Sequence, residues 1–173
     1  MMGGEKEKLK KEKYINLYMS LAERIAKMSY AKRLQVGSVL VKNDNIISFG
    51  WNGMPTGWDN NCEILEFVLK EECHYTEEWL KDNGYSETVH GWTILKSKPE
   101  VLHSEANCLM KVSRSTNSSE GASMFITHAP CLECAKMIYQ SGIKEVYFKE
   151  TYRSESGIEF LKKCNVKVIQ CEE

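Results

Sequence analysis

Apolar side chains recur at helical spacing near the start of the chain, between residues 14 and 30. They are Leu17, Leu21, Ile25 and Met28. This spacing predicts one amphipathic helix, because residues three or four apart share a helix face. The preceding residues 5–13 are almost all lysine and glutamate, and we expect them to form a frayed, solvated lead-in to the helix.

A different pattern follows, in which short apolar runs are separated by turn-forming residues. The runs 36–41 and 46–50 flank residues 42–45, Lys-Asn-Asp-Asn, and predict a strand hairpin. From residue 103 onward, helical and strand patterns alternate. The predicted helices cover 104–114, 131–141 and 156–163, and the predicted strands cover 124–127, 145–149 and 166–169.

These elements predict an α/β fold. Strands joined through helices run parallel, so the hairpin and the three later strands give a five-stranded mixed sheet in a three-layer α/β/α arrangement. With 173 residues the chain, 1–173, has the length of a single domain. A long acidic excursion interrupts it at about 57–100. Its aromatic content indicates folded structure, and we expect it to be partly helical at 63–81.

Charge and composition exclude some classes of function. Lysine plus arginine number 23 and aspartate plus glutamate number 24, so the formal net charge is −1. This balance argues against a protein that grips polyanions by overall charge. No apolar run approaches the roughly 18 residues that span a bilayer, and the charged N-terminus does not resemble a signal peptide. We therefore expect a cytoplasmic protein whose seven cysteines are thiols or metal ligands.

Two short motifs carry residues suited to a transition metal. Cys131 and Cys134 lie at a predicted helix start, where free N–H groups favour thiolates. His103, at another predicted helix start, would complete three protein ligands, the open arrangement of a catalytic zinc. Glu105 follows closely enough to reach a water at that metal. Taken alone, the cysteine pair also fits a redox pair or half of a structural zinc site.

Together the motifs read His-x-Glu and Pro-Cys-x-x-Cys, the pattern of zinc-dependent nucleobase deaminases. In that chemistry zinc lowers the pKa of water to about 7, and the water oxygen attacks C4 of a cytosine ring. Glu105 would carry the proton from the water to N3 and then help ammonia leave. A redox pair leaves Glu105 without a function, which favours the deaminase interpretation.

Beyond these motifs the chain resembles the deoxycytidylate (dCMP) deaminase family, above all its phage members, over residues 17–169. The resemblance rests on the segments 36–41, 50–57 (Gly-Trp-Asn-Gly-Met-Pro-Thr-Gly), 59–62, 103–107, 120–122, 127–131 and 140–144. The Gly-x-Asn-Gly segment before a long insertion separates this family from cytosine, guanine and tRNA adenosine deaminases. The resemblance implies a cytidine-deaminase-like fold, and hydrolysis of dCMP to dUMP and ammonia for thymidylate synthesis.

The same resemblance assigns substrate contacts by position. Asn52 matches an asparagine that hydrogen-bonds the deoxyribose, although asparagine also commonly holds its own turn. Thr127 and Ala129 match a loop whose backbone meets the pyrimidine edge. The expected contacts to the 5′-phosphate are Tyr152, Arg33 and Arg153. His128 departs from the family pattern, and we expect it to face solvent without a role.

Regulation is implied as well, because enzymes of this family are generally homohexamers, activated by dCTP and inhibited by dTTP with Mg²⁺. Their effector site lies at a subunit interface and uses a loop that here comprises Gly50, Trp51, Asn52 and Gly53. Arg114, after the helix that begins at His103, is expected near subunit contacts. Related phage enzymes carry a second, structural zinc. The ligands available for it in the excursion are Cys62, Cys73, His74, His90 and Glu100.

Two other classes of function stay open. A deaminase acting on a polynucleotide or another base would share the fold and the metal. It needs a basic groove with stacking aromatics, which the acidic excursion and the net charge disfavour, so we expect no nucleic-acid polymer as a partner. A zinc-stabilised binding module without turnover would not need Glu105, so Glu105→Gln would change nothing measurable in it.

Overall fold

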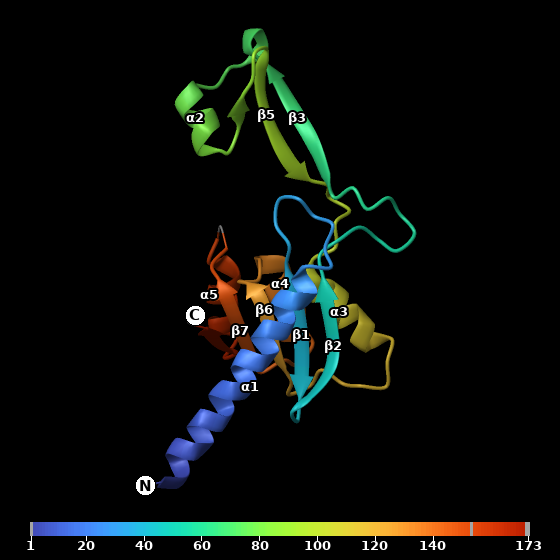
Figure 1. Ribbon diagram of the computed structural model, residues 1–173, viewed down its shortest axis with the longest axis vertical. Helices are drawn as coiled ribbons and strands as arrows, with labels where there is room; N and C mark the ends of the chain where they lie inside the picture. The colour runs from blue at the N-terminus through green and yellow to red at the C-terminus, as the bar shows by residue number, and fades with distance from the viewer. Residues whose placement is uncertain (1, 153, 172–173) are drawn as a thin grey trace.

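The computed structural model describes residues 2–152 and 154–171. It has a body built on a five-stranded sheet, with an elongated lobe beyond one end (Figure 1). The sheet order is β2-β1-β6-β7-β8, formed by β2 (Asn45–Trp51), β1 (Gly37–Lys42), β6 (Ser123–His128), β7 (Glu145–Glu150) and β8 (Lys167–Gln170). β1 is antiparallel to β2 and β6, whereas β6, β7 and β8 are parallel. The predicted mixed sheet is confirmed.

The hairpin between β1 and β2 forms because its turn residues accept a left-handed backbone. Asn43 has φ 52° and Asp44 has φ 59°. Two consecutive residues with positive φ make the tight turn whose twist matches that of the flanking strands. Asparagine and aspartate enter this region more readily than most side chains, so the sequence at 42–45 selects the turn.

Helices cover both faces of the sheet, so the three-layer arrangement is also confirmed. α1 (Met2–Ala26) covers one face through a cluster that includes Tyr18, Met19, Ala22, Val39, Val41, Phe125 and Tyr147. The opposite face is covered by α3 (Ser104–Ser113), α4 (Leu132–Gln140) and α5 (Ser156–Lys163). Their cluster includes Leu40, Cys108, Leu109, Met124, Ile126, Ile138 and Leu161. Leu40 and Val41 point to opposite clusters because neighbouring strand residues alternate between faces.

α1 differs from its predicted form in extent and in buried face. The expected solvated lead-in is part of the helix, which ends four residues earlier than predicted. Leu17 and Met28 are 50% and 57% exposed, whereas Ala22 and Ala26 are buried. A Cβ at Gly37 would overlap the backbone of both alanines. Small residues on both sides therefore let α1 approach β1 closely, and this close contact sets the buried face of the helix.

The excursion contains a folded lobe, residues 63–97, which we call the arm. Its three-stranded antiparallel sheet has the order β3-β5-β4, formed by β3 (Glu63–Leu69), β5 (Gly91–Ser97) and β4 (Ser86–Glu87). A 3₁₀ turn, η1 (Lys70–Glu72), and the short helix α2 (Glu77–Asp82) connect β3 to β4. The arm stands clear of the body's sheet in Figure 1 and meets the body at its base.

The helical interpretation of residues 63–81 is wrong for most of that range, since only its end lies in α2. β3 pairs with β5 at every residue, and Phe67 lies opposite Thr93. Apolar, β-branched and aromatic side chains fit such a pleated surface. The pairing joins residues more than twenty positions apart, so a local pattern could not reveal it. Among the described residues, no helix has both the length and the apolar character needed to cross a membrane.

Candidate active site

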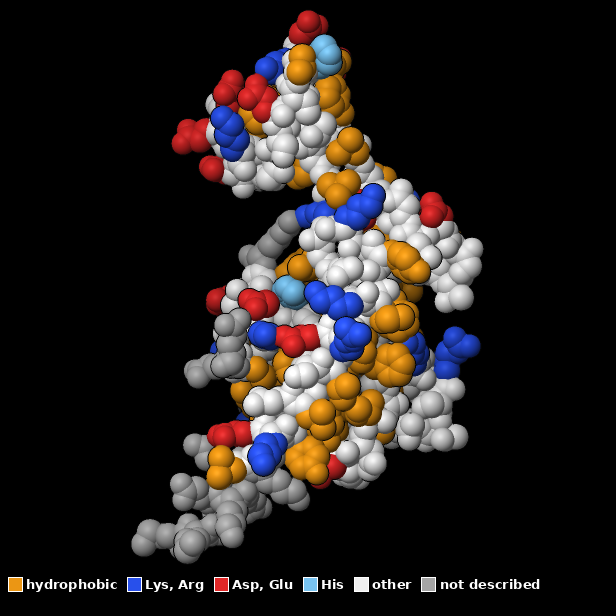
Figure 2. Space-filling model, viewed as in Figure 1, with side chains coloured by type: hydrophobic (Ala, Val, Ile, Leu, Met, Phe, Trp, Pro, Cys, Tyr) orange, Lys and Arg blue, Asp and Glu red, His pale blue; other side chains and the backbone are white. Residues whose placement is uncertain are grey.

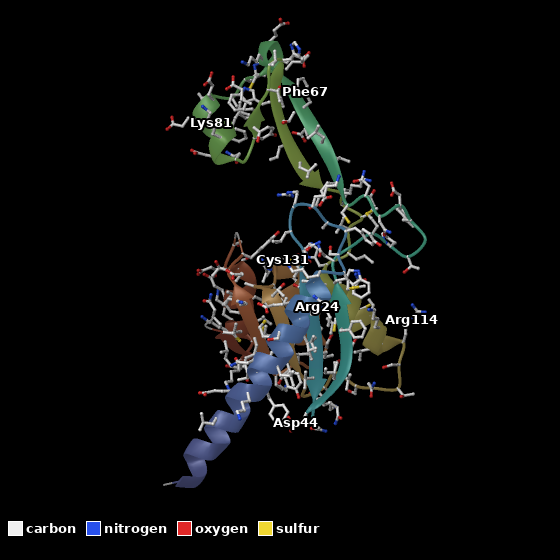
Figure 3. All side chains as sticks on the ribbon, viewed as in Figure 1. Arg24, Asp44, Phe67, Lys81, Arg114 and Cys131 are labelled. Carbon is white, nitrogen blue, oxygen red and sulfur yellow. The ribbon has the colours of Figure 1, made fainter. Side chains whose placement is uncertain are left out.

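The predicted metal ligands come together at the N-termini of two helices. His103 immediately precedes α3, and Cys131 immediately precedes α4, both with extended backbone. Cys134 lies in the first turn of α4. Nδ1 of His103 is 3.6 Å from Sγ of Cys131 and 3.4 Å from Sγ of Cys134. Figure 3 shows Cys131 at the end of the body that faces the arm.

These distances fit a tetrahedral zinc site. Zn–S bonds of about 2.3 Å and Zn–N bonds of about 2.0–2.1 Å place two tetrahedral ligand atoms about 3.5 Å apart. The three ligand atoms lie within 4.8 Å of one another, and no other described histidine, cysteine, aspartate or glutamate joins the group. Three protein ligands leave a fourth position for water or substrate, as in catalytic zinc sites.

The two thiols of this group differ in acidity. Hydrogen bonds from Cys134 and His103 lower the pKa of Cys131 to about 3, because they stabilise its thiolate. The hydrogen bond to Cys131 and burial raise the pKa of Cys134, because they disfavour a second negative charge. Without a cation the pair therefore retains one proton. A divalent cation would stabilise both thiolates.

Glu105 lies in the first turn of α3, and only 4% of it is exposed. Its Oε2 accepts a 2.8 Å hydrogen bond from Oγ of Ser104. The Ser104 carbonyl accepts a 2.9 Å hydrogen bond from Oγ of Ser38, which ties this turn to β1. Burial raises the pKa of Glu105, and the hydrogen bonds to its carboxylate oppose this effect. A buried carboxyl group with a raised pKa is suited to receive and return a proton.

A pocket of about 300 Å³ opens over these groups, with His103, Cys131 and Glu105 in its lining. This volume lies in the range of small-molecule binding sites. Three residues expected to contact substrate also line the pocket, namely Asn52, Ala129 and Tyr152. The structure therefore brings the predicted chemistry and part of the predicted binding surface to one cavity.

The side chain of Asn52 is already engaged with the loop that forms one pocket wall. Its Oδ1 accepts a 2.8 Å hydrogen bond from the Val36 N–H, and its Nδ2 donates a 2.8 Å hydrogen bond to the Leu34 carbonyl. Asn52 therefore does hold backbone, but that of a neighbouring loop and not that of its own turn, which was the alternative expected from the sequence. One N–H and one lone pair of the amide remain for a ligand.

The other expected substrate residues have different positions. Arg33 lines a second pocket of about 440 Å³, the outer pocket, which shares Tyr152 and His128 with the first. Thr127 is buried and is not among the lining residues, and its Oγ1 accepts a 3.2 Å hydrogen bond from the Gly37 N–H. Arg153 lies outside the described residues.

The segment expected to form an effector loop is only partly a loop. Gly50 and Trp51 belong to β2. Gly50 also lets β2 pack closely against the backbone of α3, since a Cβ at this position would overlap the Ser104 carbonyl. Gly53 exchanges two backbone hydrogen bonds with Leu102, of 3.0 and 2.9 Å. Arg114 ends α3 at an exposed edge of the body, as Figure 3 shows.

The residues proposed for a second zinc do not form a comparable group. Among the described residues, only the group around His103 brings three such ligand atoms within 4.8 Å. The buried thiol of Cys62 donates to the Asn60 carbonyl, and that of Cys73 donates to the Tyr75 carbonyl, each at 3.5 Å. His74, His90 and Glu100 are not part of any such group.

Several residues of the pocket lining were not predicted from the sequence. His128, expected to face solvent, lines both pockets, and burial lowers its pKa, so its ring is neutral near pH 7. Its position just before the Pro-Cys motif was the available signal. Ser97, Lys98 and Val101 also line the first pocket, where the chain returns from the arm. No motif marks them, because only the fold brings this segment over the site.

The site and fold are those of a zinc-dependent deaminase. The family model of the cytidine and deoxycytidylate deaminase zinc-binding region matches residues 12–150, which include all three ligands and Glu105. The chain therefore belongs to the cytidine and deoxycytidylate deaminase family. Within it, the chain is similar to the deoxycytidylate deaminases of Enterobacteria phages T2 and T4. It is 34% identical to the first over 147 residues, which cover 78% of each chain.

The T4 protein is 32% identical over 151 residues, which cover 78% of this chain and 76% of the relative. A solved structure with a similar fold is the cyanophage S-TIM5 dCMP deaminase in complex with dCMP and dUMP. It matches with a TM-score of 0.70 and 34% identity, over 90% of this chain and 95% of that chain. The predicted family and the cytidine-deaminase-like fold are confirmed.

Proposed function

We propose that this chain hydrolyses dCMP to dUMP and ammonia. The observation that carries the proposal is the three-ligand zinc group beside buried Glu105, both facing a pocket of about 300 Å³. The phage relatives named as deoxycytidylate deaminases and the dCMP complex of the cyanophage enzyme support the choice of substrate.

The proposed reaction divides the work between the metal group and one carboxylate. A zinc ion held by His103, Cys131 and Cys134 would supply a Lewis acid that acidifies a water molecule. Glu105 accepts a proton from this water as its oxygen bonds to C4, and returns the proton to N3. The second water proton then leaves with the exocyclic amine as ammonia. C4 gains a carbonyl oxygen in place of the amine, so that dUMP results.

The outer pocket is the proposed place for the 5′-phosphate. Arg33 and Tyr152 line it, and Arg153 follows Tyr152 in the chain. Asn52 would use its remaining N–H and lone pair on the deoxyribose hydroxyl, next to the loop that it holds. Ala129 and the Thr127 segment would meet the pyrimidine edge. An arginine can bind a phosphate with paired, charge-assisted hydrogen bonds, which favours a nucleotide over a nucleoside.

We also propose that the chain is regulated and assembled as the resemblance implies, as a homohexamer activated by dCTP and inhibited by dTTP with Mg²⁺. Asn52 lines the substrate pocket, while Gly50 packs against the α3 turn that carries Glu105. A ligand bound to the segment from Gly50 to Gly53 would therefore act on both. The product would feed thymidylate synthesis, in the host cytoplasm if the chain is phage-encoded.

The deciding experiment compares substrates on purified, zinc-containing protein. dCMP, deoxycytidine, dCTP and a cytosine-containing oligonucleotide are each followed by ultraviolet loss and ammonia release, with and without dCTP or dTTP plus Mg²⁺. We expect turnover of dCMP above all others, raised by dCTP and lowered by dTTP. Turnover of the oligonucleotide without turnover of dCMP would overturn the proposed substrate while retaining the zinc chemistry.

Arg114→Glu tests the proposed assembly. Arg114 is exposed at the end of α3, so reversing its charge is expected to weaken subunit contacts without unfolding the chain. Light scattering should report a lower mass than for the wild type, and the response to dCTP should weaken. Lys163→Glu, also exposed and at the end of a helix (α5), is the control charge reversal and should leave the mass and the dCTP response unchanged. A wild-type mass with a normal dCTP response in Arg114→Glu would contradict the prediction.

A further inference from the structure

A buried glutamate connects the arm to the wall of the outer pocket. Glu63 is the first residue of β3, and only 3% of it is exposed. Its Oε1 accepts hydrogen bonds from the backbone N–H groups of Lys32, at 2.8 Å, and Arg33, at 3.2 Å. Among the described residues its buried Oε2 has no hydrogen-bond partner.

The opposite strand of the arm holds the side chain of the same arginine. Ser97 is the last residue of β5 and lies across from Glu63 in the strand register. Its Oγ accepts a 3.3 Å hydrogen bond from Nη1 of Arg33. The base of the arm therefore holds Arg33 twice, by its backbone through Glu63 and by its guanidinium through Ser97.

Attaching a lobe to a loop through a buried carboxylate costs desolvation free energy. Removing its charge from water is unfavourable, and one of its oxygens receives no compensating hydrogen bond in the part of the chain that the structure describes. A buried group that is not fully satisfied calls for an explanation other than stability. Of the two residues whose N–H groups it binds, Arg33 is the one arginine among the described residues that line the outer pocket.

We propose that Glu63 is a positioning residue for substrate binding, which fixes the loop at Arg33 so that the guanidinium stays at the outer pocket and binds the anionic end of the substrate. The proposal rests on the proposed function, since it assigns the outer pocket to the 5′-phosphate. A preplaced arginine binds more tightly than one that must be ordered by the ligand, because the entropy loss has already occurred. The arm is then part of the substrate site.

The test uses the full chain with zinc and compares Glu63→Ala and Glu63→Gln with Arg33→Ala. We expect Glu63→Ala to raise KM for dCMP by about 10- to 100-fold and to leave kcat within about twofold. Glu63→Gln keeps an acceptor for the two N–H groups, so its effect should be smaller. Isothermal titration with dUMP should show the same order of affinities. Glu66→Gln, on the same strand but bonded to Lys96 and Tyr85 within the arm, is the control and should leave KM unchanged.

A double variant separates positioning from a merely structural role. If Glu63 acts through Arg33, Glu63→Ala should add less than about twofold to KM in the Arg33→Ala background. Effects that multiply would overturn the proposal, and so would an unchanged KM in Glu63→Ala beside a raised KM in Arg33→Ala. Should Glu63→Ala fail to fold by circular dichroism, the same comparison with Glu63→Gln and Ser97→Ala decides. Wild-type protein without dCMP turnover would instead overturn the proposed function.

Discussion

The body and the arm reach folded structure by different means. In the body, side chains such as Leu40, Ile126, Val146 and Leu161 are completely buried between sheet and helices. The arm buries far less, and its buried large hydrophobic side chains are Leu80 and Trp92. Leu65 and Phe67 on its sheet are 67% and 46% exposed. The groups that must be placed most accurately are accordingly attached to the body, at the starts of α3 and α4.

The two regions also differ in charge. Acidic side chains gather on the arm around α2, as Figure 2 shows, and include Glu77, Glu78 and Asp82. This surface would repel the phosphates of a polynucleotide. At the base of the arm the charge differs, because the residues that line the pocket there are the neutral Ser97 and the basic Lys98. The body is thus the more densely buried region and holds the metal-ligand group and Glu105, whereas the arm contributes to the pocket wall at its base.

The largest effect that would test this division is expected from Glu105→Gln in the body. Glutamine keeps the shape of the side chain but cannot carry a proton, so kcat should fall by about 10²- to 10⁴-fold. Zinc content by metal analysis and the thermal midpoint should stay near wild-type values. Glu133→Gln, exposed between the two cysteine ligands, should have normal kcat. Normal turnover in Glu105→Gln would contradict the role of Glu105 as proton carrier, whereas no turnover in either protein would point to a non-catalytic zinc module.

Metal content provides a second comparison between the two regions. Cys134→Ala removes a ligand from the body, and we expect zinc to fall from one per chain to nearly none, with loss of activity. Cys73→Ala removes one of the thiols considered for a second zinc in the arm and should leave one zinc per chain. Two zinc ions in chelator-free wild type, with one lost in Cys73→Ala, would contradict this and establish a metal site in the arm.

The smallest effects concern stability and ask whether the two regions unfold separately. Leu161 and Leu80 are 0% and 1% exposed, so cutting either to alanine should cost about 2–5 kcal/mol. In Leu161→Ala we expect the whole body to unfold earlier, with early zinc release. In Leu80→Ala the loss should fall on the arm, seen as faster amide exchange there with unchanged zinc release. A single transition shifted equally in both variants would show that the regions unfold as one unit.

Sequence patterns predicted most elements of the body because periodicity, turn residues and motifs mark them locally, although β1 pairs with the distant β6. Asn43 and Asp44 predict the turn in which they lie, and the motif residues predict the helix starts at which they lie. The buried face of α1 was harder to predict, since it depends on a close approach at Gly37 that no helical period contains.

The arm and the outer pocket depended on contacts between distant segments. β3 becomes a strand only by pairing with β5, and Glu63 meets Arg33 from thirty positions away. His128 and Lys98 reach the pocket only after the chain has folded. Neither hydrophobic periodicity nor motif spacing predicts such contacts. The metal-ligand group was thus predictable, as were the pocket residues Asn52, Ala129 and Tyr152, whereas His128, Lys98 and Val101 were not.

The hydrogen-bonded pair formed by Gly53 and Leu102 closes the base of the whole excursion. A segment that leaves and re-enters a domain at one point can change in length and sequence without displacing the rest of the fold. Here the segment includes Lys98 and Val101 from the pocket wall. Exchanging it between relatives would therefore alter which substrates are admitted while the catalytic apparatus is inherited unchanged.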